Sequence, residues 1–172
     1  MIIEYHRMRP ETREPTRANP SDAGLDVYYS PASKNEGNFR LDPGKSHMFP
    51  TGLKFGIPHG YMLQVCNRSS MGAKKSLVVG AHIIDSGYDG EVFIDLHNIG
   101  SEPQIICGGD KIAQLILVPV IHFRAKENTE DALYSAQISM SNRGTGSLGS
   151  TDKPSQDENP LPHPLDNMPP GF

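Results

Sequence analysis

The stretch GLKFGIPHGYMLQVCN, residues 52–67, alternates apolar with polar or small side chains on both sides of the turn signal PHG. Leu53 and Phe55 precede the turn, and Leu63 and Val65 follow it. An apolar residue at every second position is typical of a strand that is buried on one face. The stretch therefore predicts two short strands joined as a β-hairpin.

The same period recurs further along the chain. In EVFIDLHNIG, residues 91–100, the side chains of Val92, Ile94 and Leu96 share one face, and the run 112–120 is apolar on both faces. The first run predicts a strand buried on one side, and the second predicts a central strand. Short strands at this spacing, separated by many of the 17 glycines and 15 prolines, predict an all-β fold of the jelly-roll sandwich or barrel type.

Other elements are expected to be few. The apolar residues 2–5 predict a short first strand. Helices are expected only for a turn or two after Met71 and in TEDALYSAQ, residues 129–137, because glycine and proline are frequent. We expect one domain over residues 1–142, a glycine-rich arm over 143–151 and a proline-rich disordered tail over 152–172.

The composition excludes several classes of protein. The 172 residues, 36% of them hydrophobic and 21% charged, suit one globular domain. A formal net charge of -4 argues against a nucleic-acid partner. We expect a soluble cytoplasmic protein with no membrane partner, because neither a signal peptide nor an apolar run of about 20 residues is present. The two cysteines are too few for a disulfide scaffold.

One cluster, NRSSMGAKKS at residues 67–76, contains the donors that a phosphate needs. The Arg68 guanidinium and the hydroxyls of Ser69 and Ser70 follow an apolar strand and could hold a phosphate through charge-assisted hydrogen bonds. A short capped helix explains the two serines equally well.

The most informative cluster is AHIIDSGYDGE, residues 81–91. Two apolar residues precede Asp85, and SGYDG predicts a tight reversal that places this carboxylate and the Tyr88 ring at a hairpin tip. A carboxylate held by two strands can orient or deprotonate a water molecule. The alternative is an aspartate that only caps its own turn.

Three further clusters are weaker. In DAGLDV, residues 22–27, Asp26 starts a strand or serves as an acidic turn residue. In GGDKIAQLILVPV, residues 108–120, a buried Gln114 amide needs a hydrogen-bond partner, which could be backbone. NRGTGSLGST, residues 142–151, lacks the GK[ST] ending of a Walker A loop and reads as a flexible linker or as an arm that closes over a phosphorylated ligand.

Taken in order, the five clusters resemble the motifs of the trimeric dUTP nucleotidohydrolase (dUTPase) family: AGLDV, RSSMG, IIDSGYDGE, GDKIAQL and RGTGSLGST. The resemblance implies a jelly roll assembled as a homotrimer, with active sites at subunit interfaces and each arm reaching a neighbouring site. It also implies Mg²⁺-dependent hydrolysis of dUTP to dUMP and pyrophosphate.

The resemblance further assigns roles to individual residues. Asp85 would activate the water that attacks the α-phosphorus and would touch the sugar 3′-hydroxyl, while Tyr88 would stack on the deoxyribose and exclude a 2′-hydroxyl. Asp26 would contact the metal through water. The remaining substrate-binding residues that it implies are Arg68, Ser69, Ser70 and Gln114 for the phosphates, His82, Ile83, Ile84 and Phe93 for the uracil, and Arg143, Leu148 and Gly149 in the closing arm.

Four positions depart from the family pattern, and they keep alternatives open. His82 and Ser147 stand where glycine is usual, Leu148 where an aromatic ring stacks on uracil, and Val79 where asparagine is frequent. The related dCTP deaminases place a catalytic glutamate where Asp95 stands here. A deaminase and a modified-pyrimidine triphosphatase are therefore alternative activities. A nucleotide-sensing regulatory protein, with the tail as its partner contact, is the non-enzymatic alternative.

Overall fold

A computed structural model describes residues 1–33, 37–129 and 133 of the chain. The chain divides into two units, residues 1–123 and 124–172, and all the strands and the helix below belong to the first. In chain order they are β1 (Glu4–Arg7), β2 (Leu25–Tyr28), β3 (Asn38–Leu41), β4 (Ser46–Pro50), β5 (Leu53–Gly56), β6 (Tyr61–Cys66), α1 (Ser69–Lys75), β7 (Leu77–Val79), β8 (Ile83–Asp85), β9 (Phe93–Asn98), β10 (Gln104–Cys107) and β11 (Lys111–Pro119).

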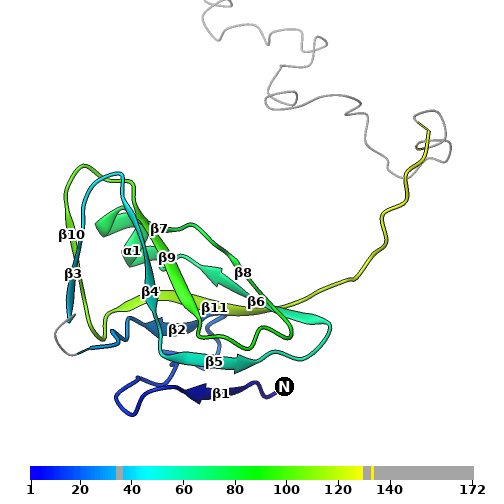
Figure 1. Ribbon diagram of the computed structural model, residues 1–172, viewed down its shortest axis with the longest axis horizontal. Coiled ribbons are helices and arrows are strands. Elements are labelled where there is room, and N and C mark those ends of the chain that lie inside the picture. The colour runs from blue at the N-terminus through cyan, green and yellow to red at the C-terminus, as the bar shows by residue number, and fades with distance from the viewer. Residues whose placement is uncertain (34–36, 130–132, 134–172) are drawn as a thin grey trace, which may run out of the picture. The chain divides into compact units, whose positions relative to one another are not determined.

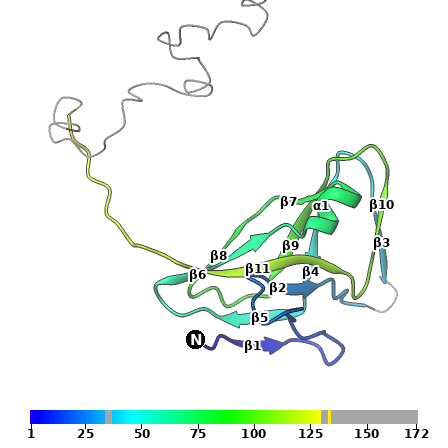
Figure 2. The same cartoon turned by 180° about the vertical axis from the view of Figure 1, so that it is seen from behind.

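Among the residues that the structure describes, all strand pairs are antiparallel, and they form four sheets (Figures 1 and 2). The largest sheet has the order β2-β11-β6-β8, and the others are β4-β9-β7, β1-β5 and β10-β3. The described part of the first unit is therefore all-β apart from the short helix α1, which confirms the predicted class. The run 112–120 lies between two neighbouring strands, as predicted, because β11 pairs with both β2 and β6.

One core holds the sheets together. Val92, which directly precedes β9, and Ile94 and Leu96 on one face of β9 are buried, and they pack in the same cluster as Phe49 of β4 and Leu115 of β11. Burial of a side chain of this size contributes roughly 1.5–3 kcal/mol relative to leaving it exposed. The predicted one-sided burial of residues 91–100 is confirmed.

The hairpin predicted for residues 52–67 is wrong. Both strands form, but β5 pairs with β1, while β6 pairs with β11 and β8. The hairpin predicted around Asp85 is also wrong, because β8 pairs with β6 and β9 pairs with β4 and β7. Alternation determines which face of a strand is buried, but it does not name the partner strand. Both connections pass from one sheet to another.

Two element boundaries differ from the prediction. The first strand lies over Glu4–Arg7 instead of residues 2–5, and all four of its side chains are exposed. Helix α1 begins at Ser69, two residues before Met71, and Met71 is its one buried side chain. The helix expected at residues 129–137 falls almost entirely outside the described residues, as do the arm and the tail. In the part of the chain that the structure describes, no helix is long and apolar enough to cross a membrane.

A histidine packed on the sheet predicts a pH-dependent stability. The His47 ring stacks on Phe39 at a centroid distance of 3.9 Å, and burial lowers the pKa of His47 below 6.5. The unfolded chain then binds this proton first as the pH falls through 6.5, so the free energy of unfolding decreases below that pH. Urea unfolding between pH 5 and 8 should show a shallower pH dependence for His47→Phe than for the unchanged chain. Parallel curves would contradict this role.

Candidate functional site

A pocket of about 410 Å³ lies beside the end of β8. It is lined by Met48, Ala81, Ile83, Ile84, Asp85, Tyr88, Val92 and Phe93. Five of these residues were singled out from the sequence, and the structure brings them together around one opening. Because most of this lining is apolar and Asp85 is the one charged side chain that the described residues contribute to it, the pocket suits a flat, weakly polar group placed next to a carboxylate.

Asp85 is free to act on a ligand. It ends β8 opposite Met62 of β6, and its carbonyl oxygen accepts the Tyr88 amide at 3.2 Å in a tight turn through Gly87, whose φ is +86°. The exposed Asp85 carboxylate has no hydrogen-bond or ion-pair partner among the residues that the structure describes. The turn is closed by the backbone, so the alternative of an aspartate that caps its own turn is wrong.

Tyr88 is held at the edge of the same pocket. Its hydroxyl donates to the Glu91 carbonyl oxygen at 2.8 Å. Its ring lies across Gly90, where an added Cβ would come within 2.4 Å of the phenolic oxygen. Glycine at position 90 therefore lets the ring lie close to the backbone.

His82 is turned away from the pocket lining. Its Nδ1 donates to the Val65 carbonyl oxygen at 2.9 Å, and the Val65 amide donates to the His82 carbonyl oxygen at 2.8 Å. The side chain thus belongs to the contact with β6, and Ala81 lines the pocket in its place. The departure from glycine at this position leaves the opening free.

A second group of predicted residues gathers around Asp26. One carboxylate oxygen accepts Arg68 Nε at 2.8 Å, and the other pairs with Lys111 Nζ at 2.8 Å. The hydrogen bond to Asp26 raises the pKa of Lys111. Asp26 lies on β2 opposite Gln114 of β11, so the reading as a turn residue is wrong. Sequence reasoning missed Lys111, although it stands three residues before Gln114 on the same strand.

The donors of this group lie at the end of the large sheet where β6 ends. Arg68 NH1 donates to Ser70 Oγ at 3.3 Å, and Gln114 Nε2 donates to the Asn67 carbonyl oxygen at 2.8 Å. Arg68 is the N-cap of α1 and makes no side-chain cap, and Ser69 and Ser70 are the first helical residues. The serines thus do not cap the helix. The partner of the Gln114 amide in this chain is backbone, one of the two possibilities left open by the sequence.

Within one chain, the Asp85 pocket and the group around Asp26 lie apart. Asp85 pairs with Met62 near the start of β6, whereas Arg68 follows Cys66 at the other end of that strand. The four steps from Met62 to Cys66, at about 3.3 Å each, amount to roughly 13 Å along β6. Arg68 lies two residues beyond Cys66. Arg143, Leu148 and Gly149 lie outside the described residues. No cluster of three or more potential metal ligands occurs among the residues described.

A glycine fixes the Gln114 side chain. An added Cβ at Gly24 would fall 1.9 Å from Gln114 Oε1 and 2.9 Å from its Cβ. We expect Gly24→Ala to push this side chain off Asn67 and to cost about 1–3 kcal/mol of stability. The resemblance implies that Gln114 holds a phosphate of the substrate, and loss of one such hydrogen bond should lower kcat/KM about threefold to tenfold. Thermal unfolding and steady-state kinetics measure both effects. Gly72→Ala, which meets nothing within 4 Å, is the matched control.

The structure defines an all-β protein with an apolar pocket beside an exposed carboxylate, and comparison with known proteins identifies the family. The family model described as dUTPase matches residues 11–151. The deoxyuridine 5′-triphosphate nucleotidohydrolase of Gloeobacter violaceus is 37% identical over 139 residues, which cover 80% of this chain and 87% of the relative. The chain belongs to the dUTPase family.

Two solved structures share the fold. A Staphylococcus bacteriophage 80alpha dUTPase mutant solved with dUpNHpp has a TM-score of 0.70 at 24% identity and covers 87% of this chain and 98% of its own. A mutant dUTPase from phage phi11 of S. aureus, described with a structural Mg(II) ion, has a TM-score of 0.67 at 24% identity, with coverages of 76% and 98%.

Proposed function

We propose that this protein hydrolyses dUTP to dUMP and pyrophosphate with Mg²⁺. Membership of the dUTPase family supports the activity. The observation that carries the mechanism is the Asp85 carboxylate, which is exposed beside an apolar pocket and has no partner in the described part of the chain. A carboxylate in this state is available to accept a proton from a water molecule.

In the proposed mechanism the uracil and the sugar occupy the 410 Å³ pocket. Backbone groups of residues 82–88 and 93 read the base edge, and the Tyr88 ring covers the deoxyribose. Asp85 orients a water molecule for attack on the α-phosphorus and accepts its proton. The new bond joins the water oxygen to the α-phosphorus, the bond from that phosphorus to the bridging oxygen breaks, and pyrophosphate leaves.

The phosphate chain would bind at the Asp26 group. Arg68, Ser69, Ser70 and Gln114 supply donors, which suits a reaction that needs mainly positioning and charge stabilisation. Magnesium fits this donor set if it is held by phosphate oxygens and waters, because both oxygens of Asp26 already bind cationic side chains and leave only contact through water. The ion would supply charge neutralisation of the triphosphate.

In the proposed function the protein is a homotrimer whose copies together form each nucleotide site. Asp85 and Arg68 lie at opposite ends of β6, so one chain does not assemble the pocket and the phosphate donors around a single nucleotide. A second copy that brings its Arg68 end to the Asp85 pocket of the first would do so. Arg143, Leu148 and Gly149 remain proposed as the arm that closes the site, with Leu148 covering the base.

The alternative activities find less support in the structure. Asp95, which matches the deaminase glutamate in position, binds His97 Nε2 at 2.9 Å and does not line the Asp85 pocket. The His82 ring contacts β6, which removes the reason to expect an altered base. A nucleotide sensor would not need an unpartnered carboxylate beside the pocket.

The activity is tested with purified full-length protein, Mg²⁺ and a panel of dUTP, dCTP, dTTP and UTP. We expect pyrophosphate release from dUTP at a kcat/KM well above that for the other three. Ammonia release from dCTP would support the deaminase instead, and tight dUTP binding without turnover would support the sensor. Light scattering of the same sample tests the trimer.

A further inference from the structure

A partly buried ion pair ties the N-terminal segment to the loop that carries Tyr88. Arg9 NH2 lies 2.9 Å from Glu91 Oε1, and Arg9 NH1 lies 3.2 Å from Glu91 Oε2. The two side chains are 19% and 12% exposed. This paired, two-pronged geometry is the strongest form of an arginine–carboxylate contact, because it fixes orientation as well as distance. Neither residue belongs to the groups assigned above.

Further hydrogen bonds hold both partners. The Gly52 amide donates to Glu91 Oε1 at 2.6 Å, and Arg9 NH2 also donates to the Ser30 carbonyl oxygen at 2.8 Å. The amide of the next residue, Val92, donates to a carbonyl oxygen of β5 at 2.8 Å. The side chain of Glu91 and the backbone that follows it are therefore fixed to two separate segments of the chain, at Arg9 and at residues 52–53.

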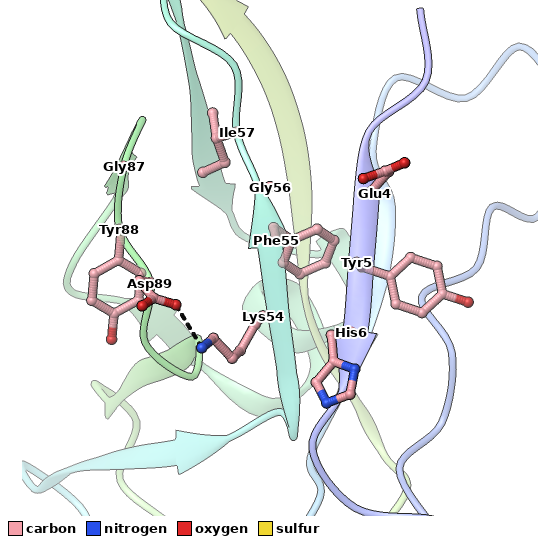
Figure 3. Close-up of a pocket in the computed structure, with 10 residues that line it drawn as sticks. All are labelled: Glu4, Tyr5, His6, Lys54, Phe55, Gly56, Ile57, Gly87, Tyr88 and Asp89. Atoms are coloured by element: carbon pink, nitrogen blue, oxygen red, sulfur yellow. Dashed lines mark ion pairs between the residues drawn. The ribbon is translucent and has the colours of Figure 1, made fainter.

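The Glu91 carbonyl oxygen accepts the Tyr88 hydroxyl, so this fixed point holds the ring. On the side away from β8, the loop tip also makes the ion pair of Lys54 with Asp89 at 2.6 Å (Figure 3). Asp89 is 91% exposed, and such surface pairs contribute little. Within the described residues, Glu91 is thus the main anchor of the Tyr88 ring on the side away from β8.

We propose that Arg9 and Glu91 are positioning residues that set the preference for deoxyribose over ribose. This inference rests on the proposed function, in which Tyr88 covers the sugar. A ring that excludes one hydroxyl group must keep its place to a fraction of an ångström, and small displacements of positioned groups change rates strongly. When the Glu91 side chain loses its contacts with Arg9 and Gly52, the Glu91 carbonyl oxygen can shift, and the Tyr88 ring that is bonded to it shifts as well. This movement opens room for a 2′-hydroxyl, while Asp85, on β8, stays in place.

The test compares the ratio of kcat/KM for dUTP to that for UTP. Glu91→Ala should lower the ratio at least about tenfold, chiefly by improving relative use of UTP. Glu91→Gln should restore most of the ratio, because its amide oxygen still accepts from Gly52 and Arg9. Tyr88→Phe, which lacks the hydroxyl, should lower the ratio by itself and make the further Glu91→Ala change nearly silent.

Ile106→Ala is the control for general loss of stability. Ile106 is fully buried in β10 and does not line the Asp85 pocket. This variant should unfold at a lower temperature and keep the ratio. An equal fall of the ratio in Ile106→Ala, or an unchanged ratio in Glu91→Ala, would overturn the proposal. If Glu91→Ala does not fold, Arg9→Lys replaces it, with an expected fall of at least about threefold because lysine lacks the paired donors.

The proposed function has a separate outcome in the same experiment. If the wild-type protein releases no pyrophosphate from dUTP, both proposals are overturned. If the wild-type protein prefers dUTP and the Glu91→Ala variant keeps the same preference, only the positioning role is overturned.

Discussion

Asp85→Asn is expected to lower pyrophosphate release from dUTP by about 10²- to 10⁴-fold while the affinity for dUTP changes only a few-fold. The amide has nearly the shape of the carboxylate but cannot take a proton from water. Since the carboxylate has no partner among the described residues, its replacement should leave the melting temperature unchanged. Single-turnover kinetics and calorimetric titration with a non-hydrolysable dUTP analogue separate turnover from binding.

Asp89→Asn is the matched control for Asp85→Asn. Asp89 is a carboxylate of the loop that follows Asp85, and Lys54 lowers the pKa of Asp89 through a hydrogen bond at the protein surface. It does not line the Asp85 pocket. Its replacement should leave turnover within about twofold, because an exposed pair contributes little. Equal losses in both variants, or full activity in Asp85→Asn, would show that another group activates the water.

The second large effect is expected for Arg68→Lys. The guanidinium binds Asp26 through Nε and Ser70 through NH1 and keeps further N–H groups for phosphate oxygens. Lysine carries the same charge but cannot serve these partners together. Loss of a charge-assisted hydrogen bond costs about 1.5–3 kcal/mol, which is roughly 10- to 100-fold in kcat/KM. Because Lys111 still pairs with Asp26, the fold should persist.

Steady-state kinetics with dUTP and thermal unfolding check the Arg68→Lys prediction. Lys74→Ala serves as the control, since Lys74 is an exposed cation on the same helix and belongs to neither group. We expect this variant to keep kcat/KM within about twofold in moderate salt, where exposed charges are screened. A similar loss in Lys74→Ala would mean that the general positive charge of this end, and not Arg68, holds the phosphates.

Much of the fold follows from the side-chain pattern because burial is a local property. Ile94 and Leu96 had to face a core once the period of two was recognised, and the doubly apolar run of β11 had to lie between other strands. Strand partners did not follow. The β5–β1 and β8–β6 pairs join segments far apart in sequence, and no local pattern specifies such a pairing.

The residues of the candidate site also fall into those that the sequence predicts and those that it does not. Asp85 and Tyr88 were found because a tight turn concentrates chemistry in a few adjacent residues. Met48 and Lys111 were missed because each reaches its group from a different strand, where it looks like any other side chain of a half-exposed strand. The Arg9–Glu91 pair was missed for the same reason, since 82 positions separate its members.

The placement of Asp85 and Arg68 at opposite ends of β6 has a genetic consequence. If each catalytic centre draws these residues from different copies, a chain disabled at position 85 and a chain disabled at position 68 can complement each other. Some centres of a mixed assembly would receive both intact side chains. Cells that carry two such defective alleles would then recover part of an activity that neither allele provides.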